Sequence, residues 1–272
     1  MDASSGFRDF EHAGWEGAAE AYAEHWGALT SQSVGPLLDA VGAGPGVTLL
    51  DVASGPGYVA AAAAARGARA TGVDFSAVMV AAAQRRYPRV TFREGEADAL
   101  PFPDATFDAV TIAYGLLHFE RPDQALAEAY RVLRPGGRVA FTVWATPDQA
   151  VGFDIILRAV QAHGDPDVAL PPAPPFFRFS DAAECRRALE AVGFRDATVG
   201  QLPQVWRLDS PDQFFAAMQH GTVRTAGLLR AQTPAALAAI GAAVRAAGAA
   251  YQHGATLEVP MPAVLARAVK PG

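Results

Sequence analysis

The sequence is poor in cysteine, lysine and long apolar runs. Its 272 residues include one cysteine, Cys185, so no internal disulfide can form. A reducing compartment is therefore expected, and the first residues, Met1 to Arg8, show no basic region followed by an apolar one, as a secretory signal would. No apolar run reaches the roughly 18 residues that a membrane-spanning helix requires. These absences predict a cytoplasmic protein without a membrane partner.

Positive charge is also scarce. The chain has 22 Lys and Arg against 28 Asp and Glu, a net charge of −6, and Lys270 is its only lysine. Because nucleic-acid-binding proteins usually present a basic face, this balance argues against a nucleic-acid partner. The length is sufficient for one large α/β domain, or for a core domain with an added lid.

Strand and helix patterns alternate through the central hundred residues. Short apolar runs predict strands at 47–52, 70–73, 90–93, 107–113 and 138–144, and helices are expected at 57–67, 76–86 and 123–133. Strands that alternate with helices of about ten residues predict right-handed crossovers and a parallel sheet. The fold class is therefore α/β, a doubly wound Rossmann-like sheet that binds its ligands at the carboxyl ends of the strands.

Helical additions are expected on both sides of this core. Residues 15–26 predict a helix with Tyr22 on its apolar face, and 37–41 predict a second. After the core we expect helices at 150–163 and 181–192, a proline-rich loop at 166–175, and strands at 197–208 and 262–269, which bring a mostly parallel sheet to seven strands. The helical tract 211–252 has no place in the sheet and is expected to form a lid. The predicted domains are a helical cap (1–33), a Rossmann-like core (34–145), and the rest of the sheet with the lid (146–272).

A glycine turn follows the first predicted strand. Gly55 and Gly57 allow the backbone to turn sharply and to approach a ligand closely, which a Cβ would prevent. The helix that follows points unpaired N–H groups at the same place, which favours an anionic group. The spacing Gly55-x-Gly57-x-x-Ala60 also satisfies the dinucleotide-binding pattern, so an NAD-dependent oxidoreductase is one alternative.

Two later segments add nucleotide chemistry. Asp74 ends the second strand, 23 residues after Asp51, where a carboxylate can accept hydrogen bonds from two ribose hydroxyls. After the third strand, Glu96 can accept from an adenine amino group, and the Ala97 N–H can donate to the ring. Residues 133–137, Leu-Arg-Pro-Gly-Gly, are interpreted as a helix stop with a left-handed glycine.

In combination, these motifs resemble the class I S-adenosylmethionine-dependent methyltransferases, specifically the type 11 group. The resemblance covers roughly residues 49–144 and depends on the segments DVASGPG, VDFS, EADALPFPDATFD and LLHFERPDQALAEAYRVLRPGG. It implies S-adenosylmethionine as cofactor and in-line transfer of its methyl group to a small-molecule acceptor, a metabolite or natural product. A protein that binds S-adenosylmethionine without methyl transfer is a second alternative.

The resemblance also implies a role for each matching position. The expected surroundings of the methionine portion are Ala53, Ser54, Gly55 and Gly57. Asp74 would hold the ribose, and the adenine site would be lined by Phe75, Ser76, Met79, Glu96 and Ala97. Tyr22 resembles the family's N-terminal tyrosine that closes over the methionine end, Trp26 could help it to stabilise the sulfonium, and Tyr114 is expected to pack on the cofactor. Ala53 departs from the family pattern, which has glycine there, and Phe119 replaces a common histidine.

Two titratable residues are candidates for chemistry. Asp51 is interpreted as an organiser of the glycine turn and, through it, a partner of the cofactor's ammonium group; beside backbone N–H groups its pKa is expected to be lowered. His118, just after the fourth strand, is the candidate general base for a hydroxyl acceptor, and it could equally be a hydrogen-bonded wall of the pocket. No metal site is predicted, because ligand spacing is lacking among His12, His25, His163, His220 and His253.

Overall fold

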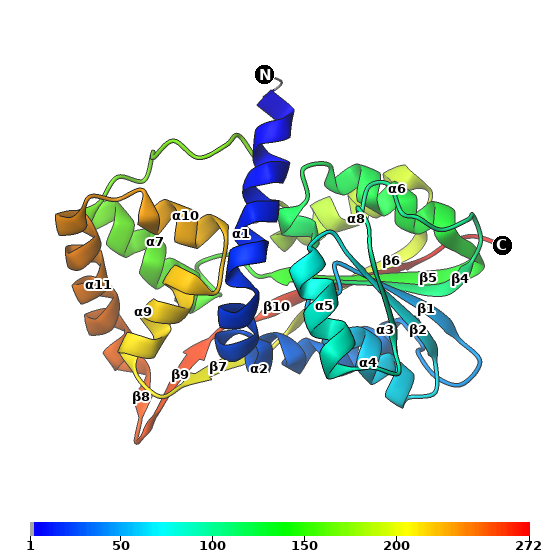
Figure 1. Ribbon diagram of the computed structural model, residues 1–272, viewed down its shortest axis with the longest axis horizontal. Helices are drawn as coiled ribbons and strands as arrows, with labels where there is room; N and C mark the ends of the chain where they lie inside the picture. The colour runs from blue at the N-terminus through cyan, green and yellow to red at the C-terminus, as the bar shows by residue number, and fades with distance from the viewer. Residues whose placement is uncertain (1–2) are drawn as a thin grey trace. The chain divides into compact units, whose positions relative to one another are not determined.

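The computed structural model describes residues 3–272, with side chains from Gly6 onward, and the chain folds into two compact units (Figure 1). The first unit contains residues up to Leu29 together with Ala145–Pro172 and Pro203–Pro262. The second contains Thr30–Trp144, Ala173–Leu202 and Ala263–Gly272. The predicted lid, 211–252, lies entirely in the first unit, and the last strand returns to the second.

A seven-stranded sheet forms the centre of the second unit, in the order β3-β2-β1-β4-β5-β10-β6. The first five strands are parallel, whereas β10 runs antiparallel to both β5 and β6. The predicted mostly parallel, doubly wound sheet is thus confirmed. The dinucleotide-binding fold has the order 3-2-1-4-5-6, so the antiparallel β10 separates this sheet from it. The strands are β1 (Thr48–Val52), β2 (Arg69–Asp74), β3 (Thr91–Glu94), β4 (Phe107–Ala113), β5 (Leu133–Trp144), β6 (Arg195–Leu202) and β10 (Ala263–Val269).

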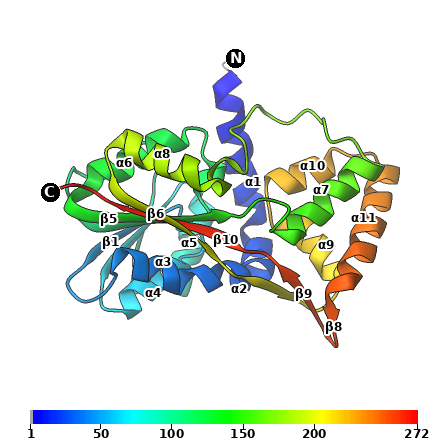
Figure 2. The same cartoon turned by 180° about the vertical axis from the view of Figure 1, so that it is seen from behind.

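Helices cover both faces of this sheet (Figure 2). On one face, α3 (Val34–Val41) and α4 (Tyr58–Ala65) pack into a core cluster with Leu49, and α5 (Ala77–Arg86) packs with α4 around Phe92. On the other face, α6 (Pro122–Val132) and α8 (Ala182–Val192) lie side by side. Short 3-10 turns η1 (Ser31–Ser33), η2 (Leu116–His118) and η3 (Arg178–Ser180) complete the unit.

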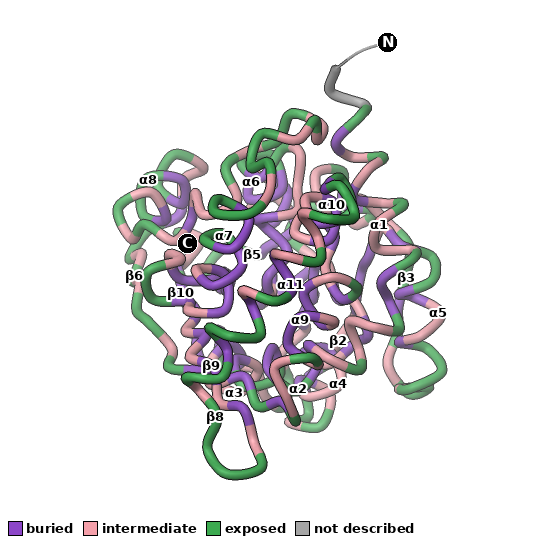
Figure 3. The backbone as a smooth tube through the Cα atoms, turned by 90° about the vertical axis from the view of Figure 1, so that its left-hand side faces the viewer, coloured by how far each residue is buried: buried purple, intermediate pink, exposed green. Residues whose placement is uncertain are grey.

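Burial follows this layering. The central strand β5 is buried along Val139–Trp144, whereas the edge strand β6 alternates between exposed and half-buried residues (Figure 3). Apolar runs such as Thr48–Val52 form strands because both of their faces are covered by helices.

Helix ends in the second unit follow local capping chemistry. Ser76 caps α5 by accepting a hydrogen bond from the Met79 N–H at 3.1 Å, and the left-handed Gly193 ends α8. The predicted helix stop at 133–137 differs in detail. Leu133 is already extended and begins β5, and the left-handed Gly136 (φ 78°) lies inside that strand, so α6 continues directly into β5.

The first unit is mainly helical with a small antiparallel sheet in the order β7-β9-β8. Trp26 is 2% exposed, and its ring lies 4.2 Å from that of Trp206 and 6.2 Å from that of Phe153. Trp26 therefore packs in the aromatic core of the first unit, and its expected contribution to stabilising a sulfonium stays a prediction. The elements are α1 (Ala3–His25), α2 (Gly27–Thr30), α7 (Val151–His163), β7 (Val205–Leu208), α9 (Pro211–His220), α10 (Arg224–Arg230), α11 (Pro234–Gly248), η4 (Ala249–Tyr251), β8 (Gln252–His253) and β9 (Thr256–Pro260).

Two predictions for the C-terminal half need correction. The single strand predicted at 197–208 is two strands, β6 and β7, in different sheets, since Pro203 between them has no N–H for a ladder. The predicted helical tract 211–252 contains three helices, and the β8–β9 hairpin, which was missed, begins at its last residue.

By length and composition alone, Pro234–Tyr251 could span a membrane, with a mean hydropathy of 1.2. Its alanines supply the apolar character, and Arg245 within it pairs with Asp212.

Lys270 caps the C-terminal end of α6. Its Nζ donates to the carbonyl oxygens of Tyr130 and Leu133, both at 2.8 Å, and lies 4.5 Å from the centroid of the Tyr130 ring. We expect Lys270→Met, which keeps an apolar stem, to lower the free energy of unfolding by about 1–2 kcal/mol, because two buried carbonyls lose a charged donor. Urea unfolding measures this loss. Arg187→Met, which breaks an exposed pair with Glu184, is the control and should change stability by less than about 0.5 kcal/mol.

Candidate functional site

The carboxylate of Asp74 joins the ends of the first two strands. One of its oxygens accepts a hydrogen bond from the Gly55 N–H at 2.8 Å, and the other accepts from the Ser76 N–H at 3.0 Å. The Ser54 N–H donates to the Val73 carbonyl at 3.0 Å, which adds a main-chain link between the glycine turn and β2. The turn after β1 and the start of α5 are therefore held by one side chain.

The glycine turn borders open space. Gly55 is left-handed (φ 49°), and a Cβ built on it meets no heavy atom of the described residues within 4 Å. Gly57 is also left-handed (φ 88°), but a Cβ there would lie 2.7 Å from the Phe92 ring. The Ser54 hydroxyl is buried and has no hydrogen-bond partner among the described residues. An open backbone, a hydroxyl without a partner among the described residues and a carboxylate at the end of β2 are suited to a nucleoside with a polar tail.

Asp51 lies beneath this turn rather than facing outward. Its two oxygens accept from the Ala60 N–H at 3.2 Å and from the Thr111 hydroxyl at 3.0 Å, and the residue is 1% exposed. Burial raises the pKa of Asp51 to about 7, against the lowering effect of both hydrogen bonds. The expectation of a lowered pKa is wrong because desolvation outweighs the two donors. The contacts agree with an organising role; a contact with an ammonium group stays a prediction.

Two residues directly after neighbouring strands have left-handed backbones. Ala53 (φ 53°) follows β1 and Tyr114 (φ 54°) follows β4. A Cβ added to Gly115 would lie 2.8 Å from the Ala53 Cβ, so the two turns approach each other closely. For non-glycine residues this conformation costs roughly 1–2 kcal/mol, and such strain tends to occur at binding and active sites. It also explains why a glycine would be easier to accommodate at position 53.

The predicted adenine residues lie on the next strand ends. Phe75 and Ser76 follow β2, and Met79 is buried in the first turn of α5. Glu96 and Ala97 are half-buried in the segment after β3, where the Gly95 N–H donates to the Asp74 carbonyl at 2.9 Å. The structure therefore brings these five residues to the same edge of the sheet as the glycine turn.

Aromatic side chains gather at the ends of β4 and β5. The ring of Tyr114 stacks on that of Trp144 at 4.3 Å, and the Tyr114 N–H donates to the Thr142 carbonyl at 2.9 Å. His118 lies in η2, edge-on to the Phe176 ring at 6.1 Å. Its place after the fourth strand is as predicted, and its role as a base stays a prediction.

Tyr22, like Trp26, is a predicted residue of the first unit. It lies on α1 in the first unit, where its ring is edge-on to that of Trp15 at 5.4 Å. The closing role expected for it stays a prediction.

Sequence reasoning missed three residues that shape the site. A Cβ on Gly72 would lie 2.8 Å from the Ser54 hydroxyl, and Gly115 makes room for Ala53. Arg131 of α6 donates hydrogen bonds to the segment between β3 and β4. Only Arg131 lies in a segment singled out from the sequence, and the two main-chain carbonyls that it contacts in the segment carry no sequence signal.

A comparison with protein families gives a match for residues 50–141, to a family described as a methyltransferase domain. Residues 50–141 form a methyltransferase domain. The resemblance to methyltransferases predicted for residues 49–144 is thereby confirmed for this segment. Among curated proteins, the demethylmenaquinone methyltransferase of Renibacterium salmoninarum is 41% identical over 130 residues, which are 46% of this chain and 55% of that protein. The chain thus spans about half the length of the curated relatives it matches.

Solved structures share the fold of the methyltransferase domain. Phosphoethanolamine N-methyltransferase 2 of Haemonchus contortus, in complex with S-adenosylmethionine, has a TM-score of 0.58 at 21% identity and covers 98% of this chain and 60% of its own. The [4+2]-cyclase SpnF has a TM-score of 0.52 at 25% identity, over 89% of this chain and 80% of its own. At such identities the first likeness concerns the fold alone.

The raised pKa of Asp51 makes the stability of the methyltransferase domain dependent on pH. Its folded-state pKa of about 7 exceeds the ordinary 3.8, so protonation of Asp51 stabilises the folded state and this contribution is lost as pH rises from about 4 through 7. Asp51→Asn removes the titration. We expect the unfolding free energy of the native protein to fall relative to that of Asp51→Asn by up to about 1.4 kcal/mol per pH unit between pH 5 and 7. Urea unfolding from pH 5 to 8 measures the difference, and a constant difference would contradict the burial argument.

The close approach of Ala53 and Gly115 predicts energetic coupling within the methyltransferase domain. Ala53→Gly should stabilise the fold by up to about 1 kcal/mol by relieving the left-handed strain. Gly115→Ala should destabilise it by about 1–3 kcal/mol, since the new methyl group would meet Ala53, Ile112 and Phe119 within 3.0 Å. Gly115→Ala should cost at least about 0.5 kcal/mol less in the Ala53→Gly background. Denaturant unfolding of all four proteins tests the cycle, and simple additivity would refute the contact.

Proposed function

We propose that the chain transfers a methyl group from S-adenosylmethionine to a small-molecule acceptor. The observation that carries the proposal is the junction made by Asp74, which holds the open turn at Gly55 beside the end of β2. The two Asp74 oxygens accept from the Gly55 and Ser76 N–H groups, and an ionised carboxylate, which has about four lone-pair sites, is a group suited to accept from ribose hydroxyls. Glu96, one strand further along the sheet, is suited to accept from the adenine amino group.

Methyl transfer from S-adenosylmethionine requires the protein mainly to align the acceptor with the methyl group. S-adenosylmethionine, when bound, supplies a methyl group that its sulfonium makes electrophilic. The residues of this chain then have to orient the acceptor and exclude water, and correct orientation is worth about 7–11 kcal/mol in favourable reactions. His118 would take the proton of a hydroxyl acceptor of high pKa, whereas an amine or an activated carbon needs no base.

A small apolar or aromatic acceptor fits the residues near the ends of β4 and β5. Tyr114 and Trp144 are buried there and stacked on each other, and Phe176 is half-buried beside His118. The Renibacterium salmoninarum relative is named for demethylmenaquinone, an aromatic acceptor, which is consistent with this class. The net charge of −6 disfavours nucleic acid, and a cytoplasmic location agrees with one buried cysteine and no disulfide.

Binding without methyl transfer is a second candidate function. The specific observation that favours it is the 25% identity to a solved protein named as a [4+2]-cyclase rather than as a methyltransferase. In that case the site would hold the cofactor while the acceptor side performs other chemistry. Product analysis separates the two candidates, because only methyl transfer releases S-adenosylhomocysteine.

Calorimetric titration with S-adenosylmethionine tests cofactor binding. We expect Asp74→Ala to weaken affinity by about 10–100-fold, the loss of one or two hydrogen bonds to a charged group. Glu94→Ala is the matched control, because Glu94 pairs with Asp74 in the β2–β3 register but is exposed. The affinity of this variant for S-adenosylmethionine should stay within about twofold of the native value. Tight binding of NADH in place of S-adenosylmethionine would overturn the proposal.

The same protein is then incubated with S-adenosylmethionine and a panel of aromatic and apolar hydroxyl, amine and carbon acceptors, including a demethylmenaquinone. Formation of S-adenosylhomocysteine with at least one acceptor supports methyl transfer. Cofactor binding with no product from any acceptor would favour the binding function.

A further inference from the structure

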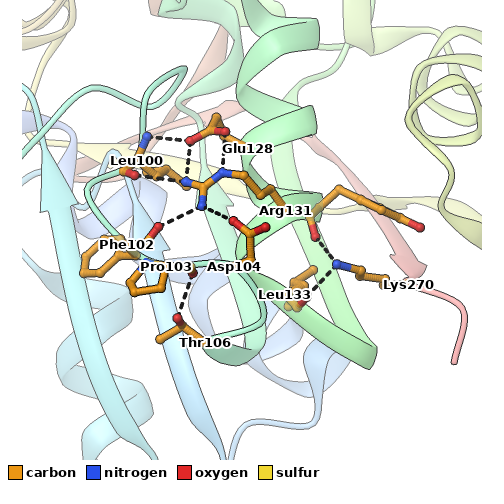
Figure 4. Close-up of polar contacts among 10 residues, drawn as sticks. Leu100, Phe102, Pro103, Asp104, Thr106, Glu128, Arg131, Leu133 and Lys270 are labelled. Carbon is orange, nitrogen blue, oxygen red and sulfur yellow. Dashed lines mark hydrogen bonds and ion pairs between the residues drawn. The ribbon is translucent and has the colours of Figure 1, made fainter.

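Two side chains on one face of α6 hold the irregular segment that joins β3 to β4 (Figure 4). Glu128 and Arg131 are three residues apart, so both project from the same side of the helix. The segment they contact, residues 98–106, follows directly after Glu96 and Ala97. Any displacement of this segment therefore acts on the two residues expected at the adenine ring.

Arg131 donates hydrogen bonds to the segment at three places. Nη2 donates to the Leu100 carbonyl at 3.0 Å, and Nη1 donates to the Phe102 carbonyl and the Asp104 carboxylate, both at 2.8 Å. The same guanidinium forms a two-point ion pair with Glu128, with Nε and Nη2 each 2.7 Å from a carboxylate oxygen. A planar group with five N–H donors can make all of these contacts at once, and an ammonium cannot.

Glu128 completes the attachment from the acceptor side. Its carboxylate accepts from the Leu100 N–H at 2.8 Å, so both main-chain groups of Leu100 are bound by the Glu128–Arg131 pair. The Glu128 side chain is 12% exposed and that of Arg131 30%. The Arg131 hydrogen bonds lower the pKa of Glu128, so the pair stays ionised at neutral pH.

The main chain of α6 fixes the other end of the segment. The Ala105 N–H donates to the Arg131 carbonyl at 3.1 Å, and the Thr106 N–H donates to the Val132 carbonyl at 2.8 Å. Ala105 itself has a left-handed backbone (φ 49°). Residues 100–106 are thus bound at both ends by the last turn of one helix, although Pro101 and Pro103 have no N–H of their own to give.

A short connection leads from Leu100 to the proposed adenine residues. Ala99 forms an isolated bridge with Glu96, in which the Ala99 N–H donates to the Glu96 carbonyl at 3.3 Å. Ala99 precedes the residue whose N–H and carbonyl are both held by α6. A displacement of Leu100 after a change at Arg131 is therefore transmitted to Glu96, which lies four residues earlier and whose carbonyl accepts the hydrogen bond from Ala99.

We propose that Arg131 is a positioning residue for adenine recognition, which acts by holding residues 98–106 so that the Glu96 carboxylate and the Ala97 N–H face the ring. This inference rests on the proposed function, because it assumes that the adenosyl group lies against Glu96. It assigns to Arg131 no contact with the cofactor. Loss of the guanidinium should therefore weaken discrimination of the adenine edge more than it weakens binding of the rest of the molecule.

The test compares two ligands on Arg131→Lys. Calorimetry measures the affinity for S-adenosylhomocysteine and for its inosine analogue, in which a carbonyl replaces the exocyclic amine, below the unfolding temperature of each variant. The native protein should prefer the adenosyl form by about 10-fold or more, one hydrogen bond to a charged acceptor. Arg131→Lys should reduce this preference to about 3-fold or less, since Lys keeps the charge but not the three-point contact.

Two further variants make the result specific. Arg134→Lys changes another arginine just beyond the same helix, which pairs with Asp108 at 2.6 Å at the surface, and should leave the preference unchanged. Asp104→Ala removes one partner of Arg131 from a side chain that is 78% exposed, so it should fold even if Arg131→Lys does not. The preference of the Asp104→Ala variant for the adenosyl ligand over the inosine analogue should fall by about twofold.

The outcomes separate this inference from the function it rests on. A native protein that binds neither S-adenosylmethionine nor S-adenosylhomocysteine would refute the proposed function itself. A native protein that binds them without preferring the adenosyl form, or an Arg131→Lys variant that keeps the native preference, would overturn the positioning role alone. A purely structural role for Arg131 predicts lower stability with an unchanged preference.

Discussion

Two hydrogen bonds to the Asp74 carboxylate are the constraint on which the rest of the site depends. They connect the turn after β1 to the helix after β2, so two crossovers that are separate in sequence share one anchor. A buried N–H that loses its acceptor costs about 1–3 kcal/mol, and Asp74 is the acceptor for two such groups. The same carboxylate lies at the expected ribose position. The proposed ribose contact is compatible with this structural role, because an ionised carboxylate has about four lone-pair sites.

The strained turns at Ala53 and Tyr114 lie next to the turn that Asp74 anchors. Ala53 and Tyr114 follow adjacent strands of the sheet and both have left-handed backbones, which would relax if their surroundings were loose. Stacking of Tyr114 on Trp144 and the absence of a side chain at Gly115 hold them in place. A rigid edge of this kind suits a reaction in which alignment supplies most of the rate, because little reorganisation is left for the moment of transfer.

The sheet and most of the site were predictable because they depend on local patterns. The apolar runs, the caps at Ser76 and Gly193, and the spacing from Asp51 to Asp74 are all visible in the sequence. Three features were not, for reasons that lie in the tertiary structure. The pKa of Asp51 follows from burial between α4 and β4, and the division at Pro203 follows from which sheet each half joins. Two of the contacts of Arg131 are made to main-chain carbonyls about 30 residues earlier.

The residues expected to recognise the cofactor and those expected to select the acceptor lie in different parts of the chain. The segment that matches the methyltransferase family, residues 50–141, contains every residue expected to touch the cofactor except Tyr22 and Trp26. Trp144, Phe176 and the whole of α7 to α11 lie beyond residues 50–141, and similarity to the curated relatives extends over about half of their length. A core that binds one cofactor can therefore keep its glycine turn, Asp74 and the Glu128–Arg131 pair while the later segments vary. If the chain has the proposed function, the shared core sets the chemistry of methyl transfer, and residues that the relatives need not share set the identity of the acceptor.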